Sequence, residues 1–386
     1  MVNRSNLHIF ILALGVFGIL NTEMGVIGIL PLIADYYNVS VSKAGLFVSL
    51  FAITVAISAP IMPLLFSRIN RKNVMLLVLA VFVLGNIVSI FSSNFTIALI
   101  ARVIPALFHP IYCSMAFTVA ANSVSTENAP KAVSKIMLGV SAGMVLGVPI
   151  TNLIANETSF EMAMLFFAVI NAITFIATLL FVPSMPVKDR LSYGSQINVL
   201  KNSITWLSIA AVIFINSAIF GVYSYLTEYL DIITNISGKS ISIMLVVYGG
   251  ANVIGNIVAG KLLTTNPIKT VVTFPFALGA VYIVLFSFGQ FTVPMAIIIL
   301  VWGILAGVGG NIAQYWITSA APKAPDFANG LFLSSANIGT SIGTAVGGLF
   351  ITAIGTQYVV LGGVLSLILC AVCILLRNNL ASYINT

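Results

Sequence analysis

The chain alternates long apolar runs with short polar gaps. A helix that crosses the hydrocarbon core of a bilayer needs about 20 mostly apolar residues. At that length the sequence of 386 residues contains twelve expected spans. They cover residues 7–30, 44–66, 74–92, 97–121, 133–154, 162–182, 203–229, 240–263, 270–289, 294–319, 328–351 and 358–376. This pattern predicts an all-α membrane protein with twelve transmembrane helices.

The longest polar interruption, residues 183–202, separates the expected spans into six and six. It holds two prolines and three basic residues, and it is too short to form a domain. We therefore predict a six-helix bundle over residues 1–182, a cytoplasmic linker over 183–202 and a second six-helix bundle over 203–386. The gaps 63–73 and 260–270 occupy equivalent places in the two halves and are both short and basic, as a duplicated unit would leave them.

Composition supports lipid as the solvent of this chain. Hydrophobic residues make up 60% and charged residues only 6%, whereas a soluble domain carries about 25% charged residues. The net charge of +7 does not indicate nucleic-acid binding, because the basic residues are spread over the gaps. We expect a membrane-embedded protein that does not bind nucleic acid.

The basic residues also predict the orientation of the chain. Of the 16 Lys and Arg, Lys43 and Lys239 lie in one set of alternate gaps, and Arg102 lies within a span. The other thirteen flank the opposite set: Arg4, Arg68, Arg71, Lys72, Lys131, Lys135, Lys188, Arg190, Lys201, Lys261, Lys269, Lys323 and Arg377. Basic gaps tend to stay in the cytoplasm, so both termini are expected on the cytoplasmic side.

Few ionisable residues lie deep inside expected spans, where such groups are costly and each is a functional candidate. Glu23 and Arg102 both lie roughly 10 Å below the outer surface at 1.5 Å per residue, so they are able to pair. His109 follows Arg102 by seven residues and so shares its helix face, two turns deeper. We expect Glu23, Arg102 and His109 to couple protons. The alternative is a set of polar anchors that brace the helices.

Uncharged polar residues within the spans are candidates for binding a polar, ring-shaped substrate. Hydrogen bonding between helices is the alternative for each of them. The predicted substrate-binding set consists of Asn21, Thr22, His109, Asn216, Tyr223, Asn252, Asn256, Asn311, Gln314 and Asn337.

Glycines recur every four residues at 139, 143 and 147, and again at 339, 343 and 347. Small residues at this spacing allow two helices to approach closely. Packing that can slide suits a transporter, although packing alone also explains the spacing. Pro149 is expected to bend its helix, because proline removes one backbone hydrogen bond.

Several segments together resemble the major facilitator superfamily over essentially the whole chain. They are residues 63–72 (PLLFSRINRK), Arg102 within IARVIPALFHP, residues 143–150 (GMVLGVPI), residues 21–35 (NTEMGVIGILPLIAD) and residues 334–348. Within the superfamily, they look most like the drug:proton antiporters of the arabinose-type sugar and purine efflux branch. Ser67 stands where the family's cytoplasmic loop usually has an aspartate, which puts that loop's charge contact in doubt.

The resemblance implies two pseudo-symmetric six-helix bundles and export of a small molecule by proton antiport with alternating access. The residues it marks for gating are Arg68, Arg71, Lys72, Gly143, Gly147 and Pro149. The expected substrate is a drug, a purine nucleoside or a sugar. The protein is expected in a bacterial inner membrane as a monomer, and its partners are the substrate, protons and membrane lipid. A proton-coupled uptake symporter of the same fold is the alternative.

The sequence does not support an enzyme, an ATP-driven pump or a channel. No nucleophile, acid pair or Walker-type loop is evident, so we expect neither an enzyme nor an ATP-driven pump. No channel filter is evident either. Cys370 and Cys373 form a C-x-x-C inside an apolar run without a second pair or a nearby His, so we expect no metal and no cofactor.

Overall fold

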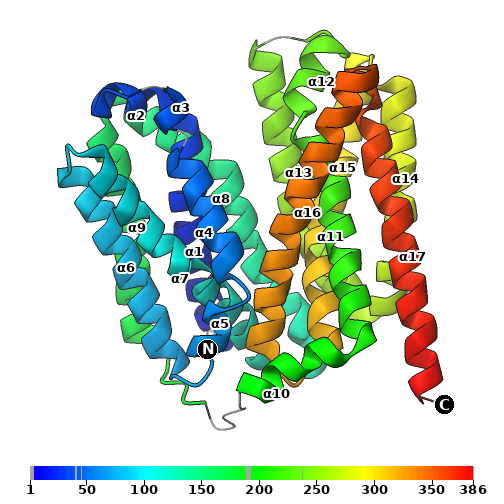
Figure 1. Cartoon of the computed structure of the whole chain (residues 1–386), viewed down its shortest axis with the longest axis horizontal. Coiled ribbons are helices and arrows are strands. Elements are labelled where there is room, and N and C mark those ends of the chain that lie inside the picture. The colour runs from blue at the N-terminus through cyan, green and yellow to red at the C-terminus, as the bar shows by residue number, and fades with distance from the viewer. Residues whose placement is uncertain (1–3, 40, 45, 188–192, 237, 386) are drawn as a thin grey trace. The chain divides into compact units, whose positions relative to one another are not determined.

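The computed structural model describes residues 4–385 apart from 40, 45, 188–192 and 237. Part of the predicted linker therefore lies outside the described residues. The chain divides into two compact units, Met1–Gln196 and Ile197–Thr386, and the division falls within residues 183–202. Each unit is a bundle of long helices (Figure 1).

Unit 1 contains five long helices and several shorter ones. Its elements are α1 (Arg4–Gly25), η1 (Val26–Ile29), α2 (Leu30–Tyr37), α3 (Val41–Ala44), α4 (Leu46–Ser58), α5 (Met62–Phe66), α6 (Arg71–Phe91), α7 (Phe95–Asn122), η2 (Thr126–Asn128), α8 (Ala129–Glu157), α9 (Phe160–Phe181) and α10 (Tyr193–Ile197), the last of which ends just inside unit 2.

Unit 2 is built from six long helices. Its elements are η3 (Asn198–Lys201), α11 (Ser203–Tyr223), α12 (Leu226–Ile232), α13 (Gly238–Thr265), α14 (Pro267–Phe288), α15 (Thr292–Ala320), α16 (Pro325–Ile354), η4 (Thr356–Tyr358) and α17 (Val359–Asn385).

The all-helical, multi-pass architecture predicted from the sequence is confirmed. In the described part of the chain, ten helices are long and apolar enough to cross a membrane. The two remaining expected spans correspond to α4 with α5 and to α16. The first pair is split at residues 59–61, and α16 has 30 residues with many Gly, Ser and Thr. The expected spans and the observed helices therefore run in the same order.

Two expected spans are interrupted near their C-terminal ends. The first span ends as an α-helix at Gly25 and continues through η1 into α2, where a proline occupies the first turn. The seventh ends at Tyr223 and resumes as α12 at Leu226. Proline is tolerated in the first turn of a helix, where a backbone N–H has no partner anyway. Hydropathy does not detect such breaks, because it averages over a window longer than the break.

The repeated glycines form one closely packed seam in each unit. In unit 1, α8 packs on α1, and a Cβ added at Gly139 or Gly143 would collide with the α1 backbone or with Leu20. In unit 2, α16 packs on α11, and a Cβ at Gly343 or Gly347 would collide with α11 carbonyl oxygens. The predicted close approach of helices is confirmed, and it occurs at equivalent places in the two units.

Candidate functional site

The Glu23 carboxylate pairs with a histidine inside unit 1. Its Oε2 lies 3.1 Å from His109 Nε2, and the two side chains are 15% and 6% exposed. Glu23 sits in the last turn of α1, whereas His109 lies in the middle of α7. The Phe51 ring packs edge-on against the imidazole at 6.0 Å, and Cys113 Sγ lies 3.8 Å from the same Nε2. The pair therefore joins a buried histidine to a partly buried carboxylate.

Arg102 joins the ends of two other segments instead of binding the carboxylate. Its Nη1 and Nη2 donate to the carbonyls of Thr22 at 3.0 Å and Glu23 at 2.9 Å, and its Nε donates to Phe47 O at 2.7 Å. The last four carbonyls of a helix lack partners within that helix, and a cation is favourable at this end. The guanidinium therefore caps α1 and fastens it to the start of α4.

Glu23 and Arg102 lie near each other, as their matching depths allowed, but the hydrogen bond between these residues runs to the Glu23 backbone carbonyl and the carboxylate pairs with His109. Depth along the helices was predicted correctly, because Arg102 does reach the residue that carries the carboxylate. The rotation of each side chain about its helix directs the carboxylate to His109 instead. The predicted shared face of Arg102 and His109 is confirmed, since both contact the end of α1.

The sequence positions α7 through its first residues. The Asn94 side chain accepts hydrogen bonds from the backbone N–H groups of Thr96 and Ile97, which is a typical helix N-cap. From there α7 runs through Pro105 and Pro110 as one helix of 28 residues. Arg102 and His109 are therefore presented from a single, well-anchored element. Pro149 likewise lies inside α8, which is one helix from Ala129 to Glu157.

Asn21 and Thr22, two predicted substrate-binding residues, lie within the packing of unit 1. Thr22 Oγ1 donates to Gly18 O and accepts from Asn171 Nδ2 at 3.0 Å, which links α1 to α9. The Asn21 amide is fully buried against Gly147, and neither its Oδ1 nor its Nδ2 has a hydrogen-bond partner. Gly147 thus leaves space for a polar group in the seam between α1 and α8.

The predicted polar residues of unit 2 fall into two groups. Asn216 and Asn337 donate to carbonyls of their own helices, Val212 O and Leu333 O. The remaining amide residues, Asn252, Asn256, Asn311 and Gln314, form hydrogen bonds with other amide-bearing residues, and some of these bonds link two helices. Asn311 Nδ2 on α15 donates to Asn256 Oδ1 on α13 at 2.6 Å.

The other amide contacts extend this polar strip along α13, α15 and α16. Asn256 Nδ2 donates to Asn252 O at 3.0 Å, and Gln314 Nε2 donates to Asn329 Oδ1 on α16 at 2.8 Å. The Asn311 Oδ1 is buried without a partner. The amide strip therefore combines helix cross-links with one buried acceptor that has no partner in the protein.

Tyr223 belongs to an aromatic cluster in the same unit. Its ring stacks on Tyr248 with centroids 4.4 Å apart, and Trp302 lies edge-on to Tyr248 at 5.2 Å. Trp302 is fully buried, whereas Tyr223 is only partly buried at the end of α11. Tyr223 therefore is the exposed edge of a rigid aromatic platform.

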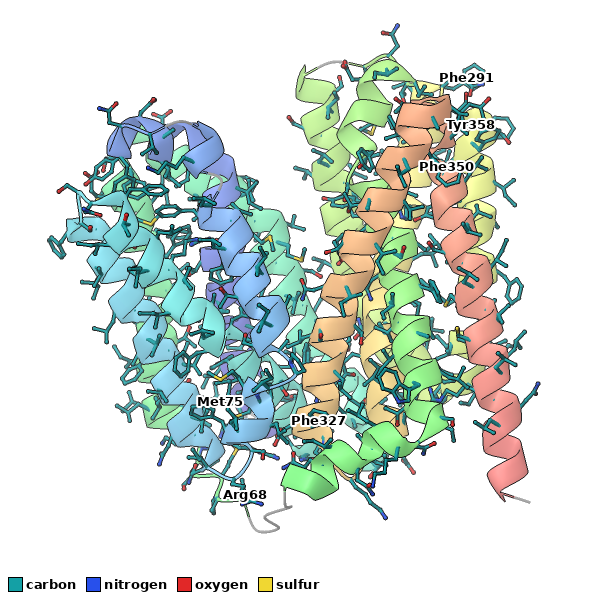
Figure 2. All side chains as sticks on the ribbon, in the orientation of Figure 1. Arg68, Met75, Phe291, Phe327, Phe350 and Tyr358 are labelled. Atoms are coloured by element: carbon teal, nitrogen blue, oxygen red, sulfur yellow. The ribbon has the colours of Figure 1, made fainter. Side chains whose placement is uncertain are left out.

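The loop that carries the predicted gating residues Arg68, Arg71 and Lys72 is tied to the end of α9 and to the residues that follow it. Asn70 caps α6 and donates to Ser184 Oγ at 2.7 Å, while Lys72 Nζ donates to Leu179 O. Ser67 Oγ accepts from Gln196 Nε2 at 2.9 Å, so a neutral hydrogen bond links Ser67 to α10. Figure 2 shows Arg68 at this end of unit 1.

The sequence did not identify several buried polar residues as important. Arg377, assigned to a cytoplasmic flank, is only 7% exposed because α17 continues past residue 376. Its guanidinium lies 3.5 Å from the Trp316 ring centroid and donates to Trp316 O and Ser319 Oγ. Asn86 and Asn171 were also missed. An amide in the middle of an apolar run was the available signal for both.

Metal-ligating residues do not cluster in the described part of the chain. Within the described ranges, no group of three or more His, Cys, Asp or Glu is arranged to hold a metal ion. Cys370 is fully buried in α17, and Cys373 lies one turn further along the same helix. Both are free thiols.

Comparison with known proteins identifies similar sequences over nearly the full length. The model of the Major Facilitator Superfamily matches residues 12–325 and again 205–382. The MFS-type transporter YtbD of Bacillus subtilis (strain 168) is 31% identical over 360 residues, which covers 92% of this chain and 91% of that protein. The inner membrane transport protein YdhP of Escherichia coli (strain K12) is 26% identical, covering 94% of each chain.

The name of a further relative mentions a substrate class. A solved structure has the same fold. The protein named "Probable sugar efflux transporter" of Helicobacter acinonychis (strain Sheeba) is 26% identical and covers 94% of this chain and 93% of its own. The crystal structure of the human organic anion transporter MFSD10 superposes with a TM-score of 0.78 at 16% identity. It covers 96% of this chain and 99% of that one.

Proposed function

This chain belongs to the major facilitator superfamily of membrane transporters, and from that premise we propose that it exports a small molecule in exchange for protons. The Glu23–His109 pair carries the proposal, because it joins a buried histidine to a partly buried carboxylate at the end of a helix that packs along a glycine seam. Ionisable groups in membrane segments are costly and mark proton or substrate pathways.

The chemistry of the pair suits proton exchange. A carboxylate and an imidazole 3.1 Å apart can share one proton, and a rotation of the Glu23 side chain that separates them leaves each to exchange with water. Arg102 holds the backbone of α1 and leaves the Glu23 carboxylate free of a direct arginine contact. Rotation of the Glu23 side chain would therefore change its partner while Arg102 keeps the end of α1 capped.

The substrate is proposed to be a neutral, polar, ring-shaped molecule such as a sugar or a nucleoside. The amide strip of unit 2 offers donors and acceptors, and Tyr223 offers an aromatic face. Sites that orient polar ligands combine a few hydrogen-bonding groups with apolar walls. The relative named for sugar efflux supports the same class. Stabilisation of the purified protein against heating by sugars, nucleosides and amphiphilic drugs would rank these classes.

The proposed location is the inner membrane of a bacterium, with both termini in the cytoplasm. The bias of thirteen basic residues against two supports this orientation. Cysteine accessibility at residue 2 and in the 92–94 loop, measured from each side of the membrane, would test it.

Inverted membrane vesicles distinguish export by antiport from uptake by symport. Vesicles are energised so that the interior is acidic, and a sugar or nucleoside is then added outside. Antiport releases protons and makes the interior more alkaline, whereas symport carries protons inward and acidifies it further. An absence of any proton movement, with substrate accumulation unaffected by a proton gradient, would contradict both versions of proton coupling.

Glu23→Gln tests the residue assignment. The amide keeps the size of the side chain but cannot take up and release a proton, so transport driven by a pH gradient should be lost together with its pH dependence. Counterflow of labelled substrate, which needs no net proton movement, should persist. Proton-driven export at the wild-type rate in this variant would exclude Glu23 as the proton carrier.

A further inference from the structure

A small internal cavity lies behind Arg102, on the side where α6 packs. It has a volume of about 10 Å³, and all the residues that line it are buried. Its polar lining consists of Thr22, Asn86, Ser89 and Arg102, and the rings of Phe47 and Phe51 close it off. This volume is the space open to the centre of a water molecule. A cavity with roughly 10–15 Å³ of such space holds one water, provided that two to four polar groups bind it.

Asn86 contributes a hydrogen-bond donor that has no partner in the protein. Its side chain is 6% exposed, and its Nδ2 is buried without an acceptor. A buried donor left unpaired costs about 1–3 kcal/mol, so such groups in native proteins are usually bound to ordered water. Asn86 lies on α6, whereas the helix end that Arg102 caps belongs to α1.

The remaining groups of the cavity complete a water site. A guanidinium has five N–H donors, and three of those of Arg102 are occupied by carbonyl oxygens. Ser89 Oγ donates to Gly85 O, so its lone pairs remain able to accept. A single water is thus able to accept from Asn86 and Arg102 and to donate to Ser89.

We propose that this cavity binds one ordered water and that Asn86, through this water, holds the Arg102 guanidinium against the end of α1. Asn86 is then a positioning residue for the proton-coupling pair. It touches neither Glu23 nor His109, but it fixes the group that holds the Glu23 backbone. The functional consequence rests on the proposed proton antiport, whereas the water site itself does not.

Two substitutions that change the cavity in opposite ways distinguish a water-mediated role of Asn86 from a packing role. Asn86→Leu keeps the side-chain volume but removes the donor and excludes water. Asn86→Ala enlarges the cavity, so that a second water is able to replace the amide. Water-mediated positioning predicts that proton-driven export falls about tenfold in the leucine variant and clearly less in the alanine variant. Packing alone predicts the reverse order, because the alanine variant leaves the larger void.

Counterflow distinguishes the positioning role from a purely structural defect, because a structural defect would reduce counterflow as well as proton-driven export. Both Asn86 variants should keep wild-type counterflow, because only proton coupling depends on the position of Glu23. Ser208→Ala serves as a control for the loss of a buried polar group away from this cavity, since Ser208 is a buried hydroxyl on α11 that donates to its own helix at Ile204 O. It should leave both transport modes unchanged. Equal loss of counterflow and proton-driven export, or a milder effect for leucine than for alanine, would overturn the positioning role.

An experimental density map of the wild-type protein tests the site directly. The map is expected to show one water within hydrogen-bonding distance of Asn86 Nδ2 and Arg102, and Asn86→Leu should lose it. A map with protein atoms filling this space, or with Asn86 Nδ2 bound to a carbonyl, would refute the water site. This result is independent of proton coupling, so a failure of Glu23→Gln to affect transport would leave the water site standing and remove only its proposed consequence.

Discussion

Replacement of Arg102 by lysine tests whether the fork of the guanidinium holds α1 and α4 together. Arginine reaches three carbonyl oxygens from three different nitrogens, at 2.7, 3.0 and 2.9 Å. Lysine keeps the charge but donates from one nitrogen, so it cannot span carbonyls on two helices in the same geometry. The substitution therefore isolates shape from charge.

The structure sets the size of the expected effect. Hydrogen bonds to charged groups contribute about 1.5–3 kcal/mol each, so the loss of two of the three costs at least about 3 kcal/mol. For a unit of about 200 residues, such a loss lowers the unfolding temperature by roughly 6–12 °C. Proton-driven export should fall strongly as well, because the Glu23 backbone is no longer fixed beside His109.

The three cysteines provide the assay. Cys113 and Cys370 are buried and Cys373 is partly buried, so a thiol-reactive fluorescent dye reports unfolding on heating. Export is measured in parallel in energised vesicles. The unfolding temperature of Arg102→Lys should fall, and its ratio of proton-driven export to counterflow should fall too.

Arg377→Lys is the matched control for this prediction. Arg377 also uses its fork, with bonds to Trp316 O and Ser319 Oγ, but it lies in unit 2 and contacts neither Glu23 nor His109. This variant should be less stable than wild type while its proton-coupling ratio stays unchanged. An Arg102→Lys protein with wild-type stability and wild-type export would show that the carbonyl contacts do not hold α1 in place.

Two further predictions concern the seams and the amide strip. Gly343→Ala brings a Cβ against the Ser217 backbone, so overpacking should lower stability by about 1–3 kcal/mol and abolish transport. Gly310→Ala, whose Cβ meets nothing within 4 Å, should keep transport and lose no stability. Thermal unfolding and counterflow check both, and a fully active Gly343→Ala would refute a tight seam. Asn311→Leu removes the 2.6 Å bond to Asn256, so it should raise the KM for substrate while the pH dependence of export stays as in wild type. An unchanged KM would exclude this amide from substrate binding.

The sequence predicted the candidate site in part. Glu23, Arg102 and His109 do converge at the end of α1, as their depths and spacing indicated. The partners within the group were not predictable, because depth along a span does not fix the rotation of a side chain about the helix axis. The same limit applies to Asn216 and Asn337, whose amides turn back to their own helices, and to Arg377, which a folded α17 buries.

By itself the sequence determined that lipid surrounds this chain, how many apolar segments it has and in what order, and where glycines permit close contact. Each of these properties depends on the local composition of one segment and is therefore readable from that segment alone. Only the tertiary structure decided that His109 faces the Glu23 carboxylate, that Arg102 caps α1, and that Asn256 and Asn311 join two helices. Those contacts depend on how neighbouring helices rotate and pack against each other, and that geometry is a property of the whole bundle.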